Sequence, residues 1–315
     1  MSTSYSNLLS LLGTPDTDPT SLLNAAMEFS AESAEVPELA SAVAADAGEK
    51  LIEALETSGA RGMSDAFIEL GTLYRAGGTW RSRLIERHID NALDAFRRAD
   101  TLGHRDGSIM VVDTIYHSGR TDLASEAWAR LRSITDQDPS QTGALFMQGL
   151  LTQEGFGVSR NLEAAMEYFR EAADRNDADA AFQLALYFLT GECGVERNDD
   201  LGIRWLERAA ELGSVRAMHN FGAFYGVGDR GLPRDPEQSL NWYLKAASST
   251  PVPHGEASFS AGVMLLRGDV GHPQPLAANA HLWAAVRVLG EDVVQDRLDR
   301  MDLIWIPLRP STAVE

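Results

Sequence analysis

Apolar positions recur with a helical period through the middle of the chain, separated by short polar runs rich in glycine. The same layout occurs four times: an apolar helical pattern, a glycine-rich turn, and a second helical pattern that ends in small residues. The four segments are residues 142–176, 179–213, 214–247 and 254–286. Because self-similarity at a fixed period is typical of repeat proteins, the sequence predicts consecutive helix-turn-helix hairpins.

One small residue in the first helix of each segment marks the period. Gly149, Ala185, Gly222 and Gly262 occupy matching positions, at spacings of 36, 37 and 40 residues. Two helices approach closely only where the facing side chains are small, while large side chains such as Trp205 fill the adjoining space. We therefore expect the two helices of each hairpin to touch at this position.

The turn at residues 226–236, GVGDRGLPRDP, has glycines that allow positive φ and a proline that can restart a helix. Gly226, Gly228 and Gly231 also satisfy the dinucleotide-binding pattern GxGxxG. That pattern needs a preceding strand, so that the glycines can pass a pyrophosphate onto a helix N-terminus. The preceding residues, MHNFGAFY, have a helical pattern, so we interpret the segment as a turn between helices.

Several motifs recur in register and together resemble the SEL-1-like repeat family, a relative of the tetratricopeptide repeats. They are LALYF with GECGV and WLERAAELG, NFGAFYGVG with WYLKAA, and GFGV with YFREAA. The resemblance covers about residues 65–286 and is strongest over 142–247. It implies an all-α fold, a right-handed α-solenoid of stacked helix-turn-helix repeats. It also implies a non-catalytic adaptor or scaffold that acts through protein–protein interaction.

The predicted organisation has four parts along the chain. We expect a flexible N-terminus at residues 1–19, an N-terminal helical cap at 20–62, about six repeats over 63–286, and a C-terminal capping helix and tail at 287–315. Caps are expected because the end of a solenoid must shield its last apolar face. The tail segment IWIPLRP, residues 304–310, either folds back over the last repeat or is an exposed docking segment. We favour folding back, because exposed Trp and Ile are costly for solubility.

The charge balance narrows the class of partner. Only 27 basic residues stand against 46 acidic ones, a net charge of -19, and such a surface repels phosphate backbones and anionic lipid. We expect a protein or peptide partner, with a basic partner surface as one candidate, and neither nucleic acid nor membrane. Cys193 is the single cysteine, and no secretory signal or long apolar run is present, so we expect a cytoplasmic protein. The sequence gives no indication of the oligomeric state.

Candidate catalytic chemistry is sparse. No two of the seven histidines lie four residues apart with a Glu between them, GxSxG is absent, and Cys193 lies in a repeat turn. We therefore expect no catalytic residue, no metal and no cofactor, and predict that the protein is not an enzyme. Two alternatives stay open: a hydrolase of the kind attributed to some SEL-1-like repeat proteins, or a small-ligand sensor, which would need a closed pocket.

The resemblance to tetratricopeptide-type repeats implies that the first helices line a concave groove. Positions three before each small residue would then point inward, with further positions one turn on and charged residues at the near end. Such a groove, with an apolar floor and charged edges, suits an extended peptide or a partner helix. The alternative is that the aromatic members pack between helices and never contact a ligand. The predicted partner-binding residues are Ile68, Thr72, Arg75, Phe146, Leu150, Gln153, Asp179, Phe182, Leu186, Leu189, Arg216, His219, Phe259 and Val263.

Overall fold

The computed structural model is helical throughout its described part and contains no strand there, so the predicted all-α class is confirmed. The chain divides into two compact units, Met1–Asn161 and Leu162–Glu315. The described residues are 10, 11, 21, 25, 52–76, 88–138, 140–192, 194–249 and 254–305.

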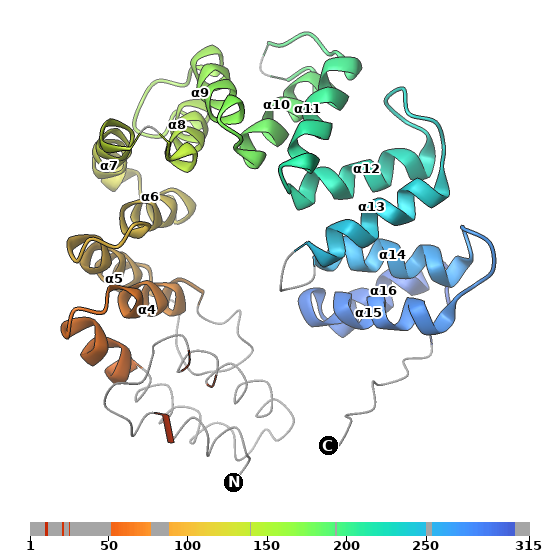
Figure 1. Ribbon diagram of the computed structural model, residues 1–315, viewed down its shortest axis with the longest axis horizontal. Helices are drawn as coiled ribbons and strands as arrows, with labels where there is room; N and C mark the ends of the chain where they lie inside the picture. The colour runs from red at the N-terminus through yellow and green to blue at the C-terminus, as the bar shows by residue number, and fades with distance from the viewer. Residues whose placement is uncertain are drawn as a thin grey trace. The chain divides into compact units, whose positions relative to one another are not determined.

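In the first unit, consecutive helices pack against one another in chain order (Figure 1). The helices are α4 (Ser64–Ala76), α5 (Ile89–Thr101), α6 (Gly107–His117), the short 3₁₀ helix η2 (Thr121–Leu123), α7 (Ala124–Gln137) and α8 (Thr142–Glu154). Most of the predicted flexible N-terminus and N-terminal cap lies outside the described residues. Among the residues of this part that are described, Ala25 and Leu55 are buried in one cluster with Phe67 and Leu70 of α4.

In the second unit, successive hairpins also stack in chain order, which confirms the predicted solenoid arrangement (Figure 1). The helices are α9 (Leu162–Asp174), α10 (Ala178–Thr190), α11 (Asp199–Glu211), α12 (Val215–Val227), α13 (Pro236–Ser248), α14 (Gly255–Arg267), α15 (Pro275–Leu289) and α16 (Glu291–Asp299).

The same backbone hydrogen bond closes the turn between the two helices of several hairpins. The residue just before the second helix donates its N–H to a carbonyl in the last turn of the first helix, three residues after the small position. This bond fixes where the chain re-enters a helix and satisfies a carbonyl that the first helix leaves without an intrahelical partner. The pairs are His88 to Tyr74 (2.9 Å), Asn161 to Thr152 (3.1 Å), and Asn198 to Phe188, Asp235 to Tyr225 and Gln274 to Leu265 (2.8 Å each).

The small positions in the first helices lie against bulky side chains of the second helices, as the sequence predicts. A Cβ atom added to Gly222 would lie 2.6 Å from the ring of Tyr243, and one added to Gly262 would lie 2.8 Å from Leu282. Such distances are far inside van der Waals contact, so the helices can pack this closely only because the side chain is absent.

The segment with the GxGxxG pattern is a turn between two helices. The helix α12 precedes it, and Gly228 caps that helix in the left-handed conformation at φ 76°. Asp235 then caps α13, its side chain accepting a hydrogen bond from the N–H of Gln238 at 3.0 Å. The prediction of a turn is confirmed, because no strand precedes the glycines.

The end of the described chain folds back onto the last hairpin. The indole Nε1 of Trp305 donates a hydrogen bond to Oδ1 of Asn279 at 3.0 Å, and the ring meets that of Trp283 edge to face at 5.6 Å. Only 6% of Trp305 is exposed. The prediction of folding back is thus confirmed for Trp305, whereas the segment from Ile306 onward lies outside the described residues.

Gly71 of α4 provides a direct test of close helix packing. Its added Cβ would lie 2.5 Å from the ring of Phe96 on α5, so Gly71→Ala forces a buried ring to move. We expect the free energy of unfolding to fall by about 1–3 kcal/mol in denaturant titrations. Gly143→Ala on α8 is the control, because nothing lies within 4 Å of its Cβ. It should leave stability unchanged or raise it slightly through helix propensity; equal losses in both variants would contradict the packing account.

Trp305 and its neighbour Ile304 form a matched pair for testing the closing contact. Trp305 is buried, whereas 85% of Ile304 is exposed. We expect Trp305→Ala to lower the free energy of unfolding by about 3–5 kcal/mol and Ile304→Ala to change it by less than about 0.5 kcal/mol. Thermal and denaturant unfolding measure both, and a Trp305→Ala variant as stable as wild type would contradict the structural role.

Candidate partner-binding face

The first-helix face is the name used here for the predicted site positions on α4, α8, α10, α12 and α14. Six of these positions lie in the first unit, on α4 and α8, and all six are partly buried. Ile68, Phe146 and Leu150 pack against the edges of the buried core clusters. The remaining three positions of this unit are Thr72, Arg75 and Gln153.

Arg75 and Gln153 are already engaged within the first unit. The Arg75 guanidinium pairs with Asp113 of α6 and lies 5.7 Å from the ring centroid of Phe96. Gln153 donates from Nε2 to Glu154 at 3.0 Å. Arg75 therefore connects α4 to α6, whereas the Gln153 contact stays within α8.

In the second unit, four of the predicted groove residues lie below the surface. Phe182, Leu189, Phe259 and Val263 are between 2% and 6% exposed. Their burial matches the alternative raised from the sequence, in which apolar members of the set pack between helices. What reaches solvent on this face is the layer of polar side chains above them.

Arg216 of α12 covers the first of these aromatic rings. Its guanidinium lies 4.6 Å from the ring centroid of Phe182 and pairs with Asp179 of α10 at 2.8 Å. The side chains of Arg216 and Asp179 stay 52% and 56% exposed. The ring therefore holds the cation in place while much of the charge faces water.

The same arrangement is repeated two hairpins further on, at α14. Arg297 of α16 lies 5.5 Å from the ring centroid of Phe259 and pairs with Glu256 of α14 at 2.7 Å. The hydrogen bond from Arg297 holds the pKa of Glu256 below its ordinary value. Sequence reasoning missed Arg297, because it lies outside the repeat segments and reaches this face only through the fold of α16.

His219 of α12 lies between these two ion pairs. Its ring centroid is 5.3 Å from that of Tyr243 and 5.8 Å from that of His254. Burial lowers the pKa of His219, and the neighbouring His254 lowers it further. His254 in turn caps α14, with Nδ1 accepting a hydrogen bond from the N–H of Ala257 at 3.2 Å.

These groups form a charged row across the second unit: Asp179 with Arg216, His219 with His254, and Glu256 with Arg297. Leu186 of α10 is partly buried on the same face. The row presents cations, anions and imidazoles on a helical scaffold.

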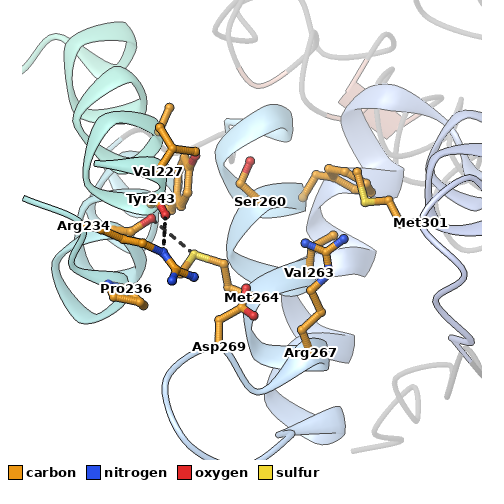
Figure 2. A pocket seen from close by; sticks show the side chains of 14 residues that line it. Val227, Arg234, Pro236, Tyr243, Ser260, Val263, Met264, Arg267, Asp269 and Met301 are labelled. Atoms are coloured by element: carbon orange, nitrogen blue, oxygen red, sulfur yellow. Dashed lines mark hydrogen bonds between the residues drawn. The ribbon is translucent and has the colours of Figure 1, made fainter. Parts of the chain in front are cut away.

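A cavity of about 290 Å³ opens beside α12, α13 and α14. Figure 2 shows side chains that line it, and Phe259 and Val263 of the predicted set are among them. Its lining residues are Ala223, Gly226, Val227, Arg234, Pro236, Ser239, Tyr243, Phe259, Ser260, Val263, Met264, Arg267, Asp269 and Met301. We call it the α14 pocket.

Most residues of the α14 pocket were not predicted from the sequence. Arg234 could have been found by aligning the turns, since Arg160 and Arg197 precede their second helices at the same position. Arg160 and Arg234 both donate from Nε to a carbonyl of the preceding helix, of Gln153 at 3.0 Å and of Gly226 at 3.3 Å. The sequence gives no such indication for Met301, because it follows α16 and lies outside the repeat pattern.

Two further features concern metals and membranes. The described residues contain no group of three or more His, Cys, Asp or Glu side chains arranged to hold a metal ion. No helix in the described ranges is both long enough and apolar enough to cross a lipid bilayer.

Stacked helical hairpins define an α-solenoid repeat protein. The family model for the Sel1 repeat matches residues 143–177, 178–214 and 215–250. The chain therefore contains three Sel1 repeats, and the resemblance read from its motifs is confirmed. No curated protein shows significant sequence similarity to it.

Solved structures of similar fold share little sequence with this chain. A protective antigen with an SLR fold from uropathogenic Escherichia coli has 21% identity and a TM-score of 0.49, covering 87% of this chain and 59% of its own. A Sel1 repeat protein from Oxalobacter formigenes has 18% identity and a TM-score of 0.44, covering 86% and 98%. An immunity protein from Pseudomonas aeruginosa has 16% identity and a TM-score of 0.42, covering 89% and 86%. The chain thus spans 59% of the Escherichia coli protein.

Two histidines make the second unit less stable in mild acid. Burial lowers the pKa of both His219 and His281. In the unfolded chain a histidine titrates near about 6.5, so the unfolded state binds more protons as the pH falls below that value. The stabilisation is fully present above about pH 6.5 and is lost as the pH falls through the lowered pKa values of the folded state.

We expect the midpoint of thermal unfolding to fall by on the order of a few degrees between about pH 7.5 and about pH 5.5. The His219→Gln/His281→Gln double variant should show a flatter dependence over this window. Glu256 does not account for the change, because its lowered pKa places its titration at a lower pH. Parallel curves for wild type and double variant, measured by calorimetry, would show that other groups are responsible.

Proposed function

We propose that this protein is a non-catalytic adaptor or regulator that binds a protein or peptide partner through its first-helix face. Sel1 repeats generally mediate protein–protein interaction, and three of them span residues 143–250. The observation that carries the proposal is the charged row of the second unit, which lies over the buried aromatic rings of α10 and α14.

The pair formed by Arg216 and Asp179 supports recognition better than it supports stability. An exposed ion pair contributes about 0–1 kcal/mol to folding, because water and salt screen it. The same charges are valuable to a partner, since complementary charges set specificity and the rate of association. Stacking on Phe182 at 4.6 Å also restricts the Arg216 side chain before any partner arrives, which lowers the entropy lost on binding.

The overall charge favours one kind of partner surface. With a net charge of -19, the chain attracts a basic protein surface and repels phosphate backbones. An inhibitor or immunity factor that masks a basic protein is a subtype of this function. Cationic groups of such a partner would meet Asp179 and Glu256, which lie 56% and 44% exposed in the row.

Arg216→Glu is the decisive variant. It reverses the charge in the first pair of the row and places a carboxylate beside Asp179. In quantitative affinity capture from extracts of the source cells, we expect the full-length wild type to retain a partner that the variant loses by about tenfold or more. The midpoint of thermal unfolding should change by no more than a few degrees, because the pair is exposed.

Arg204→Glu on α11 is the matched control, since Arg204 is also exposed but belongs to a second helix. It should retain the partner at the wild-type level. Retention of every captured protein by Arg216→Glu would overturn the assignment of the binding face. Equal loss in Arg204→Glu would point instead to a non-specific effect of charge.

A further inference from the structure

We propose that the α14 pocket is an anchor site for a partner polypeptide, accepting a bulky apolar side chain that is followed by an acidic residue. This inference rests on the proposed function, because it names the element of the partner that the second unit recognises. The apolar side chain enters the pocket, and the carboxylate meets the two arginines among its lining residues.

The origin of the pocket lies in a difference between two turns. Gly228 to Gly231 reads GDRG after α12, and Gly268 to Gly271 reads GDVG after α14. Both turns begin with a left-handed glycine, at φ 76° and 75°, and both place an aspartate N–H 3.1 Å from a carbonyl of the preceding helix. The two turns therefore begin alike and diverge at the third residue, where Arg230 has a positive φ of 55° and Val270 does not.

Arg230 bridges the preceding hairpin in a way that Val270 cannot. Its Nη1 donates to the carbonyl of Leu189 at 2.5 Å and to Asp199 at 3.0 Å, which ties the α12–α13 turn to the end of α10 and the start of α11. In the next repeat the corresponding positions are Gly226 and Pro236, and both line the pocket. The valine side chain cannot make these hydrogen bonds, and Gly226 and Pro236 line an open cavity.

The interior of the pocket suits an apolar group. Tyr243, Phe259, Val263 and Met264 are all less than a tenth exposed and supply mainly carbon and sulfur surface. The buried hydroxyl of Ser239 is already used, since it donates to the carbonyl of Gly222 at 2.6 Å. A polar occupant would find few free partners there.

Pockets that bind small molecules generally start at about 300 Å³, so a cavity of about 290 Å³ accommodates roughly one or two side chains. These dimensions favour an anchor residue of a polypeptide over a large separate ligand.

Apolar surface continues outward from the pocket. Val227 and Met301 both line it, yet they are 71% and 41% exposed. Exposed apolar side chains beside a preformed cavity are typical of a surface that a partner covers. The flexible Met301 and Met264 side chains can adapt to the shape of the entering group.

Charge complementarity identifies the flanking group as a carboxylate. The lining residues include two arginines, Arg234 and Arg267, but only one carboxylate, that of Asp269. In the described part of the chain neither guanidinium is paired with a carboxylate, whereas Arg216 and Arg297 of the charged row are both paired. The Nε of Arg234 is fixed by the carbonyl of Gly226 at 3.3 Å, which leaves its Nη groups to donate to a partner.

Methionine methyl resonances offer a site-specific test in the full chain. The protein is labelled with ¹³C-methyl methionine, and Met264→Leu and Met301→Leu variants assign the two pocket signals. The probe is the capped dipeptide N-acetyl-Leu-Glu-amide, compared with N-acetyl-Leu-Lys-amide and N-acetyl-Gly-Glu-amide. We expect the Leu-Glu probe to shift both signals and to bind about fivefold more tightly than the Leu-Lys probe. The Gly-Glu probe should leave both signals in place.

The Arg234→Gln/Arg267→Gln double variant tests the carboxylate. It should bind the Leu-Glu probe no more tightly than the Leu-Lys probe, while Arg204→Gln keeps the wild-type preference. Unmoved pocket signals, or an unchanged preference in the double variant, would overturn the proposal. Binding of 4-methylpentanoate as tight as that of the Leu-Glu probe would overturn it in favour of a small-molecule site.

These outcomes are separable from those of the proposed function. A pocket that fails to bind the Leu-Glu probe leaves the effect of Arg216→Glu on partner capture untouched. Conversely, if Arg216→Glu captures its partner as well as wild type does, the proposed binding face is wrong, even where the methyl signals show that the pocket binds the Leu-Glu probe.

Discussion

The close contact between a small residue of one helix and a bulky side chain of the next is the constraint on which the rest of the structure depends. Where Gly222 meets Tyr243, the absence of a side chain sets the distance between α12 and α13. The backbone hydrogen bond from Asp235 to Tyr225 then fixes where the second helix begins. With both spacing and entry point fixed, each hairpin offers the next one a surface of constant shape, and the units can stack.

Stacking brings polar side chains of successive first helices into a line. The two members of each ion pair come from different helices, so neither ion pair exists within a single hairpin. The arginines serve two physical roles there, because their guanidinium planes cover aromatic rings while their charges stay partly in water. The packing that stabilises the repeats therefore also prepares the recognition surface.

A single turn residue changes what the repeats leave open. Arg230 closes the space between one pair of hairpins by bonding to Leu189 and Asp199. Val270, at the matching sequence position in the turn after α14, is shorter and uncharged, and the α14 pocket lies between α12, α13 and α14. Repetition makes the scaffold regular, whereas departures from the repeat create individual sites.

The sequence by itself determined the fold class, because the small positions, the glycine turns and the helical period are all local patterns that recur in register. It also located Arg216 and His219 on the face that carries the charged row. Only the tertiary structure decided which apolar members of that face are covered, since the burial of Phe182 and Phe259 depends on arginines from other helices. The α14 pocket and the contribution of Arg297 were likewise decided by tertiary structure, because they join residues whose proximity no local pattern records.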